Sequence, residues 1–398
     1  MMFLLAKKAN DIISKIAFAK DTIQKVKSPD NVLETYIEPL TSWLDILRSR
    51  VEQAKANFEE FVHDASFVEE DYLREESQRR LLAIILRDFE DIERRVYISI
   101  DTFLPLILVW NSQKSRTETK QQHRLLMHFI TDLLQLCHIS ESMMTIIGEY
   151  YACLPLEWAQ VRKHVVFCTY SEMQNLRKWV LLAHEFGHVY YFQNVEKINS
   201  SITPQVIRRL NENRPINLDQ INFESIIYTW TQHWIPEFVS DCFAAKTLGP
   251  AFIAQFMVTM LDSQPNRIEF THPPPNLRLR FMMNILDALN LSEIDINSYR
   301  NKWQSYAHTI SRPSSLFIVH EEVVRTALRG IDSIVTEKPI ENKWADILEV
   351  KKTLDLGSIP DQDLISIISA LAIAEPNINY SLLYRALLKR YASNSYAP

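Results

Sequence analysis

The sequence predicts a mainly α-helical protein, and three observations support this fold class. Only 5 of the 398 residues are glycine, and the pairs typical of tight hairpins, Asn-Gly and Asp-Gly, do not occur. Long stretches repeat apolar residues at helical spacing. Hydrophobic residues make up 47% of the chain and charged residues 23%, the ordinary balance of a globular protein. A chain of this length can bury a large core, in one domain or in two to three subdomains.

Residues 1–150 are expected to form a helical bundle or a helical hairpin region. The apolar pattern predicts helices at about residues 1–26, from 31 onward, at 69–104 and at 118–150. Pro39 should kink the second helix, and residues 112–117 have the composition of a polar linker. A full heptad register is not sustained, so an ordinary bundle and a coiled-coil-like hairpin both stay open.

The most informative motif lies in the middle region, residues 151–292, and is His184-Glu185-Phe186-Gly187-His188. Two His at i and i+4 lie on one face of a helix, where they can share one metal ion. The neighbouring Glu185 can reach a water bound to that metal. Apolar segments flank the motif, so the helix should be buried, and burying two His and a Glu without partners is costly. The motif therefore predicts a single Zn²⁺ ion and the apparatus for hydrolysing an amide.

Glu237 is the best candidate for the third protein ligand that a catalytic zinc needs. Pro236 fits the first turn of a helix that Gly249-Pro250 should end. Glu237 and Asp241 are one turn apart, so one carboxylate can bind the metal and the other can accept the N–H of a ligating His. The alternative is a helix with acidic residues near its N-terminus, which the helix dipole favours.

These two segments together resemble the gluzincin metallopeptidases, in which the third ligand is a Glu in an E-x-x-x-D helix. Glu237 follows His188 by 49 residues, a spacing similar to that of the CAAX-prenyl-protease-like branch. The segment from Thr271 to Arg280 also resembles the T-H-P-P-x-x-x-R segment that follows the Glu helix in that branch. The resemblance covers about residues 160–290, and the long apolar spans of the membrane-bound members have no counterpart here.

The resemblance implies a zincin-like metallopeptidase core with a small sheet, flanked by helical N- and C-terminal regions. It implies that His184, His188 and Glu237 bind Zn²⁺ and that Glu185 is the general base. Asp241 would orient a ligating His, preferably His184. His272 would stabilise the oxyanion, and Arg278 or Arg280 would brace the site or bind the substrate carboxylate. Without the two upstream motifs, His272 would be an ordinary loop residue and the arginines a solvated face.

Two further segments of the middle region bear on substrate binding. Residues 164–170 are the best strand candidate in the chain, and a strand before the metal helix is the zincin arrangement, where the edge strand holds an extended substrate by β-addition. The alternative is a short buried strand without a ligand. Residues 193–232 are expected to be rich in loops and to form a lid, a specificity insert or a plain connector.

Residues 293–398 are expected to form a helical C-terminal region. The predicted helices cover residues 296–310, 314–335, 361–374 and 379–392, with a linker at 336–345. No motif assigns this region a task, and it could bind a regulatory partner, as could the N-terminal helices.

Charge and cysteine usage narrow the class of partner and the compartment. The net charge of −6 gives no electrostatic footprint for nucleic acid. The four cysteines, Cys137, Cys153, Cys168 and Cys242, are scattered, as expected for buried thiols in a reducing compartment. No apolar stretch is long enough to span a bilayer, and the N-terminus lacks the features of a signal peptide. We therefore expect a cytoplasmic protein.

The sequence thus favours a zinc-dependent endopeptidase of gluzincin type that hydrolyses peptide bonds of a specific intracellular protein. One alternative is a non-catalytic, zinc-stabilised helical scaffold or regulator, in which Glu185 has no chemical task. The other is a sensor protease that acts on one dedicated partner rather than on general peptides.

Overall fold

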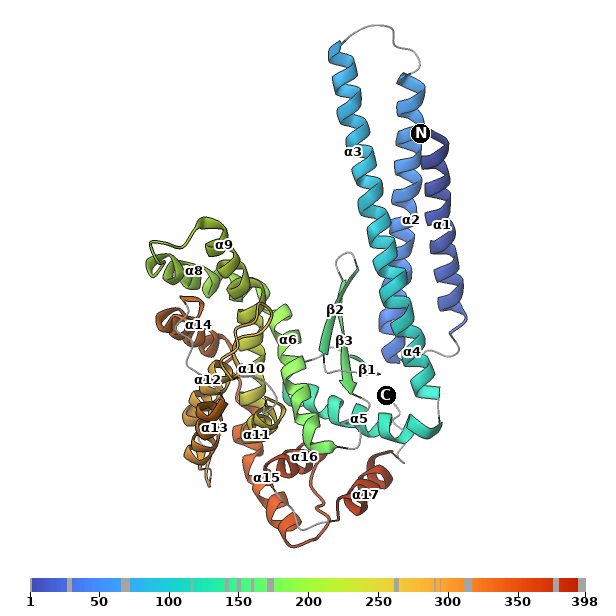
Figure 1. The fold of residues 1–398 in the computed structure, drawn as a ribbon. Coiled ribbons are helices and arrows are strands. Elements are labelled where there is room, and N and C mark those ends of the chain that lie inside the picture. Colours follow the sequence, from blue (N-terminus) through green and yellow to red (C-terminus); the bar gives the residue numbers. More distant parts are fainter. Residues whose placement is uncertain are drawn as a thin grey trace.

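The fold is mainly α-helical with one small sheet, as predicted, and Figure 1 shows a long helical arm standing beside a body of shorter helices. The computed structural model describes residues 2–26, 31–65, 72–115, 117–139, 143–148, 152–158, 161–169, 175–260, 265–289, 291–293, 295–310, 317–374 and 379–392.

Three helices, α1 (Met2–Gln24), α2 (Asn31–Ala65) and α3 (Tyr72–Tyr97), form the arm. Apolar side chains at helical spacing line its core, for example Ile12 and Ile16 of α1 and Leu44 and Leu47 of α2. Ion pairs such as Lys20 Nζ with Asp45 Oδ1, at 2.5 Å, lie at its surface, where they contribute little to stability. Pro39 lies inside α2.

A π-helical turn connects the arm to the next helix, and the predicted linker at 112–117 plays no part in this connection. A π-helical segment, η1 (Ile98–Phe103), joins α3 to α4 (Leu104–Ser115), and α5 (Thr117–Leu136) follows. Pro105 lies just after η1, and its missing N–H and bulky ring disrupt ordinary α-helical bonding to the preceding turn. The predicted linker at 112–117 is wrong, because helix lies on both sides of residue 116.

The sheet has three strands in the order β1-β3-β2, and it corrects two predictions. The strands are β1 (Met144–Gly148), β2 (Ala152–Trp158) and β3 (Val161–Thr169). The helix predicted for 118–150 is wrong beyond Leu136, since β1 falls within it. The strand at 164–170 exists as part of β3, although residue 170 lies outside the described residues. However, β3 is central: it pairs in parallel with β1 and antiparallel with β2, so it is not a free edge for β-addition of substrate.

The sheet separates two hydrophobic cores. Val165 of β3 packs with Met144 and Ile146 in the core of the arm, whereas Val166 and Cys168 pack into the core of the helical body. Alternate residues of a strand point to opposite faces, so β3 contributes to both cores at once.

Tyr36 of α2 ties the arm to this sheet. Its buried hydroxyl accepts a hydrogen bond from Met144 N, at 2.8 Å, and donates one to the carbonyl oxygen of His164. These are backbone groups of β1 and β3 at the end of the sheet where their pairing begins. The hydroxyl therefore provides a hydrogen-bond partner for two buried backbone groups at the end of the β1–β3 pairing.

The body consists of short helices around a second core. Its helical elements are η3 (Leu176–Leu181), α6 (Leu182–Gln193), α7 (Val195–Ser201), α8 (Thr203–Glu212), α9 (Gln220–Tyr228), η4 (Thr229–Trp234), α10 (Ile235–Leu248), α11 (Pro250–Thr259), α12 (Pro275–Ala288), α13 (Ile296–Ile310), η6 (Phe317–Val319), α14 (Glu321–Ile334), α15 (Pro339–Asp355), α16 (Leu364–Ile373) and α17 (Tyr380–Ala392).

Two segments expected to lack regular structure are helical. Residues 193–232 form α7, α8 and α9 with short connections, because Val206 and Leu210 bury one face of α8 against α14. The expectation that this segment is rich in loops is therefore wrong. The linker predicted at 336–345 is also wrong, since α15 begins at Pro339, a residue favoured in the first turn of a helix.

The C-terminal helices belong to the same core as the middle of the chain. One cluster of buried apolar residues extends from Leu125 to Leu387. Hydrogen bonds also connect the central helices to α14. Tyr190 of α6 donates to the carbonyl oxygen of Ile334, at 3.0 Å, and Lys246 of α10 donates to that of Asp332, at 3.1 Å. The last turn of α14 is thus fixed by side chains from two central helices.

Three cysteines, Cys137, Cys168 and Cys242, are buried and carry free thiols, whereas the side chain of Cys153 lies outside the described part. Within the described ranges, no helix combines the length and apolar character needed to cross a membrane.

The role of Tyr36 is tested by removing its hydroxyl. We expect Tyr36→Phe to lower the free energy of unfolding by about 1–3 kcal/mol, because two buried backbone groups lose their partner. Urea denaturation followed by circular dichroism measures this. Tyr97→Phe is the matched control, since the Tyr97 hydroxyl lies in an exposed contact with Lys15, and its effect should stay within about 0.5 kcal/mol. Equal effects of the two substitutions would contradict the structural role of Tyr36.

Candidate metal centre

The helix that carries the H-E-x-x-H motif lies deep in the body. The 3₁₀ segment η3 leads directly into α6, and Ala183, Phe186 and Val189 of α6 are fully buried. Glu185 is also buried, at 8% exposure, while His184 and His188 are partly exposed. The apolar residues around the motif therefore place α6 in the core, as their pattern predicts.

Pro236 lies in the first turn of α10, as predicted, but α10 is not a separate helix. Instead α9, the π-helical segment η4 and α10 form one continuous helical stretch from Gln220 to Leu248. Pro236 follows η4 as Pro105 follows η1, and in both places a π turn accommodates the residue that cannot donate a backbone bond. The proline therefore marks the first turn of the α-helical segment, whereas the π turn that joins this segment to α9 was not predicted. Glu237 lies in the first α-helical turn after this widening.

Gly187 lets α6 and α10 touch backbone to backbone. A Cβ atom at this position would lie 2.4 Å from Ser240 Cα and 2.8 Å from Ser240 O, distances that no real side chain tolerates. Position 187, directly before the second His, must therefore be glycine for the helices to approach this closely. The approach brings one turn of α6 against one turn of α10.

The three predicted ligand residues converge at this contact. His184 Nε2 lies 3.4 Å from Glu237 Oε2, and His188 Nε2 lies 3.4 Å from Glu237 Oε1. One donor atom from each residue can be chosen so that all lie within 4.8 Å of one another. Two ligands bound tetrahedrally to one Zn²⁺ at ordinary bond lengths are about 3.4 Å apart. The spacing and chemistry of these donors therefore fit a zinc ion.

Asp241 lies behind His184, on the side away from Glu237. The carboxylate Oδ1 is 3.0 Å from His184 Nδ1, which leaves Nε2 directed toward Glu237. Burial by itself lowers the pKa of His184, but hydrogen bonds with Asp241 and Glu237 outweigh it and raise the pKa to about 10. The same contact fixes the orientation of the imidazole ring, as carboxylates commonly do for metal-binding His.

Arg278 holds both carboxylates, and Arg280 does not take part. Arg278 Nε and Nη2 lie 2.7 and 2.8 Å from the two oxygens of Asp241, and Nη2 is also 3.1 Å from Glu237 Oε2. Burial raises the carboxyl pKa values of Glu237 and Asp241, but the guanidinium charge and the His contacts outweigh it, so both lie below their ordinary values. Arg280 is exposed. The structure thus selects Arg278 as the brace, and because it is buried and fully engaged it is not placed to receive a substrate carboxylate.

Two aromatic rings of α11 cover this network, and the sequence alone did not identify them. Phe252 stacks parallel to His184, with ring centroids 6.4 Å apart. Phe256 lies under Arg278, whose Cζ is 4.7 Å from the ring centroid. No motif marks these residues, since apolar side chains at helical spacing are ordinary core; only the packing of α11 against α10 and α12 places them here.

His272 approaches the centre from the loop before α12. It is 53% exposed at its side chain, and its Nε2 lies 3.7 Å from Glu237 Oε1, while its Nδ1 is 2.9 Å from Thr271 Oγ1. A ring nitrogen of this residue therefore faces the ligand cluster from the solvent side. The structure brings His272 together with the residues predicted from the motifs.

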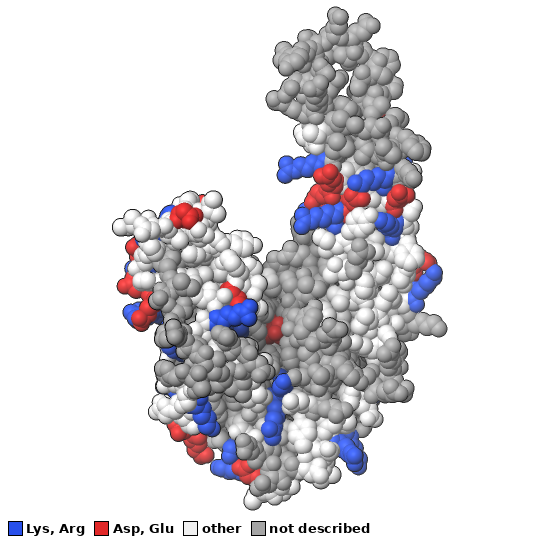
Figure 2. Space-filling view, in the orientation of Figure 1, with Lys and Arg blue, Asp and Glu red and all other residues white. Residues whose placement is uncertain are grey.

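Figure 2 shows a hollow in the surface between the arm and the part of the body formed by α8 and α9, and atoms of Asp or Glu are visible inside it.

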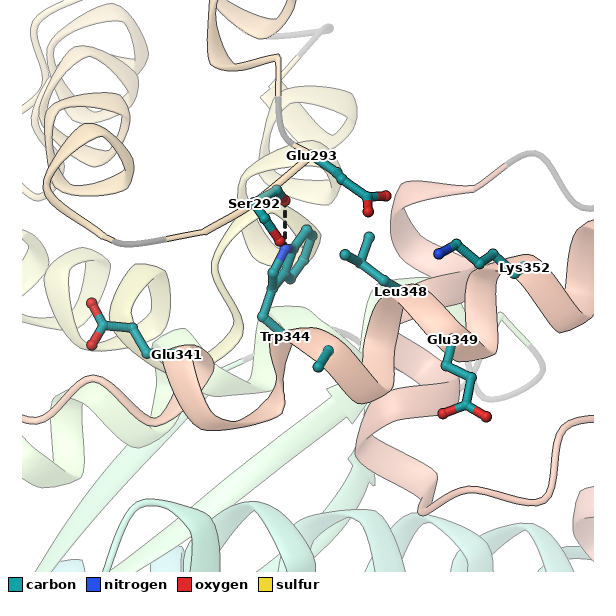
Figure 3. Close-up of a pocket in the computed structure, with 8 residues that line it drawn as sticks. Ser292, Glu293, Glu341, Trp344, Leu348, Glu349 and Lys352 are labelled. Atoms are coloured by element: carbon teal, nitrogen blue, oxygen red, sulfur yellow. Dashed lines mark hydrogen bonds between the residues drawn. The ribbon is translucent and has the colours of Figure 1, made fainter.

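A separate cavity of about 400 Å³ lies beside α15 (Figure 3), where Trp344 Nε1 donates to Ser292 O, at 2.8 Å. Glu341 and Glu349 point away from Trp344 there, and no residue of the metal cluster lines this cavity. The candidate site is therefore defined by its side-chain chemistry rather than by that cavity.

Comparison of the chain with protein-family models, with curated proteins and with solved structures finds no match.

The two arginines provide a matched pair for testing this network. We expect Arg278→Gln to lower the free energy of unfolding of the metal-free protein by about 3–5 kcal/mol, because two buried carboxylates lose the guanidinium that contacts both of them. Arg280→Gln changes an exposed residue and should stay within about 0.5 kcal/mol. Urea denaturation in the presence of a chelator measures both. Similar losses in the two variants would show that Arg278 does not brace the carboxylates.

Proposed function

We propose that the protein is a zinc-dependent endopeptidase of gluzincin type with a zincin-like core. The observation that carries this proposal is the convergence of His184, His188 and Glu237, whose donor atoms lie within 4.8 Å of one another, with Glu185 adjacent on the same helix. Asp241 supports His184 from behind, as expected where a His serves as ligand. The resemblance of the three sequence segments to the gluzincins points to the same class.

His184, His188 and Glu237 would hold the zinc ion, which when bound acidifies a water molecule and polarises the substrate carbonyl. The residues of the chain supply the remaining steps. Glu185 accepts a proton from the attacking water and passes it to the leaving amine. His272, whose Nε2 faces the cluster, donates a hydrogen bond to the oxyanion that forms at the carbonyl. Asp241 and Arg278 keep the ligands in place throughout.

We favour one specific protein substrate over general peptides, because the arm is attached to the sheet that packs against the motif helix. The arm is attached to the central sheet through Tyr36 and through Val165, which packs in the core of the arm. A partner that binds and moves the arm would therefore also move the sheet, which packs against α6, the helix that carries His184 and His188. This favours the sensor protease, active on one dedicated partner, as the second candidate.

Glu185→Gln separates catalysis from metal binding. We expect the variant to keep one zinc ion per chain and the wild-type stability, while cleavage falls by about 10²–10⁴-fold, because only the proton transfer is removed. Zinc analysis of the purified protein and N-terminal proteomics of cells expressing wild type or variant measure the two properties. His184→Ala is the control and should lose zinc and cleavage together.

The comparison of wild type, Glu185→Gln and His184→Ala also tests the alternative of a non-catalytic scaffold stabilised by zinc. If wild type and Glu185→Gln yield the same set of protein N-termini, whereas His184→Ala loses zinc and stability, then the metal is structural and the hydrolytic proposal fails.

A further inference from the structure

Helical spacing places four residues along one side of the stretch α9–η4–α10, the last of them a residue of the metal cluster. The members of this line are Ile221, Tyr228, His233 and Glu237. Ile221 and Tyr228 are seven residues apart, or two α-helical turns. Tyr228 and His233 are five apart across η4, or one π-helical turn, and His233 and Glu237 are four apart, or one α-helical turn. The π turn therefore keeps on one side of the helix residues that a regular α-helix would set out of line.

The ring contacts and the gradient of exposure support this alignment. Tyr228 and His233 meet edge to face, with ring centroids 5.5 Å apart. Exposure falls along the line, from 81% at Ile221 to 58% at Tyr228, then to an intermediate value at His233 and to 7% at Glu237. The line thus descends from open surface to the ligand cluster.

The loop before α12 adds a second wall at the same end. Trp234 Nε1 donates to the carbonyl oxygen of Glu269, at 3.0 Å, which fixes this loop against η4. The next residue, Phe270, is 65% exposed, and His272 two residues further on lies 3.7 Å from Glu237 Oε1. A large apolar side chain is therefore held in solvent within two residues of a group that faces the cluster.

We propose that Ile221, Tyr228, His233 and Phe270 form the docking surface for an apolar segment of the polypeptide substrate, next to the bond that is cut. This inference rests on the proposed peptidase function. The occupant is argued from continuity: the line ends at a metal ligand, so whatever covers it lies against the reaction centre. Large exposed apolar side chains that gather around a site mark binding surfaces, and aromatic residues contribute strongly to them. The substrate class is thus a protein segment with apolar or aromatic side chains rather than a charged one.

Binding rather than cleavage tests the surface, with zinc-loaded Glu185→Gln as the host protein. The probes are two fluorescein-labelled dodecapeptides of Ser and Gln, one of which carries Leu or Phe at every second position. The apolar peptide should bind and the polar one should not. Adding Tyr228→Ser and Phe270→Ser should weaken binding of the apolar peptide by about tenfold or more, because two anchors are removed. Adding Leu356→Ser instead is the matched control: Leu356 is 83% exposed and caps the C-terminal end of α15, so its loss should leave binding unchanged.

Three results would overturn the docking surface: equal affinity for both peptides, no binding of either, or unchanged binding after the double substitution. Thermal unfolding of each variant verifies that the surface changes leave the fold intact. Failure of the proposed function gives a different pattern. If wild type cleaves no protein in the proteomic comparison while the apolar peptide still binds through Tyr228 and Phe270, the hydrolytic proposal falls and the surface is a binding site for apolar segments without cleavage.

Discussion

The close contact of α6 with α10 is the constraint on which the candidate centre depends. Gly187 and Ser240 meet backbone to backbone, so a turn of each helix lies directly against the other. On α6 that turn carries the two His, and on α10 it carries Glu237 and Asp241. Had the helices been separated by one more side chain, the imidazoles and carboxylates would face each other across a gap too wide for a single ion. The chemistry of the site therefore follows from a packing distance.

That contact carries a cost, because it gathers carboxylates in the core. Two buried acids close together are unfavourable unless cations accompany them. Arg278 supplies one cation, held between Asp241 and Glu237 and resting on Phe256. The raised pKa of His184 reflects the same demand for positive charge. C-terminal helices complete the enclosure, since α16 packs behind α11 and Gln255 Nε2 of α11 donates to Ala372 O, at 3.1 Å. Distant parts of the chain thus stabilise one charged cluster.

Sequence reasoning predicted the centre better than its surroundings, for physical reasons. Residues at i and i+4 share a helix face whatever the tertiary structure, so the His pair and the pair Glu237 and Asp241 could be read directly. The choice between Arg278 and Arg280 could not, since it depends on how α12 packs. The central position of β3 was likewise hidden, because strand pairing is non-local and its partners β1 and β2 have weak sequence patterns. The π turn before Pro236 was not predicted, since a proline in the first turn of a separate helix and a proline after a π turn give the same local signal.

Zinc content after substitution of Gly187 tests the central claim most directly. Gly187→Ala places a methyl group against the backbone of Ser240, so α6 and α10 must separate and the ligands with them. Gly330→Ala is the matched control, because a methyl group there meets only the flexible side chain of Ile202, at 3.1 Å. Metal analysis of the purified, folded proteins should find about one zinc per chain in wild type and in Gly330→Ala, and a loss of most of it in Gly187→Ala. Stoichiometric zinc in folded Gly187→Ala, or none in wild type, would contradict the account.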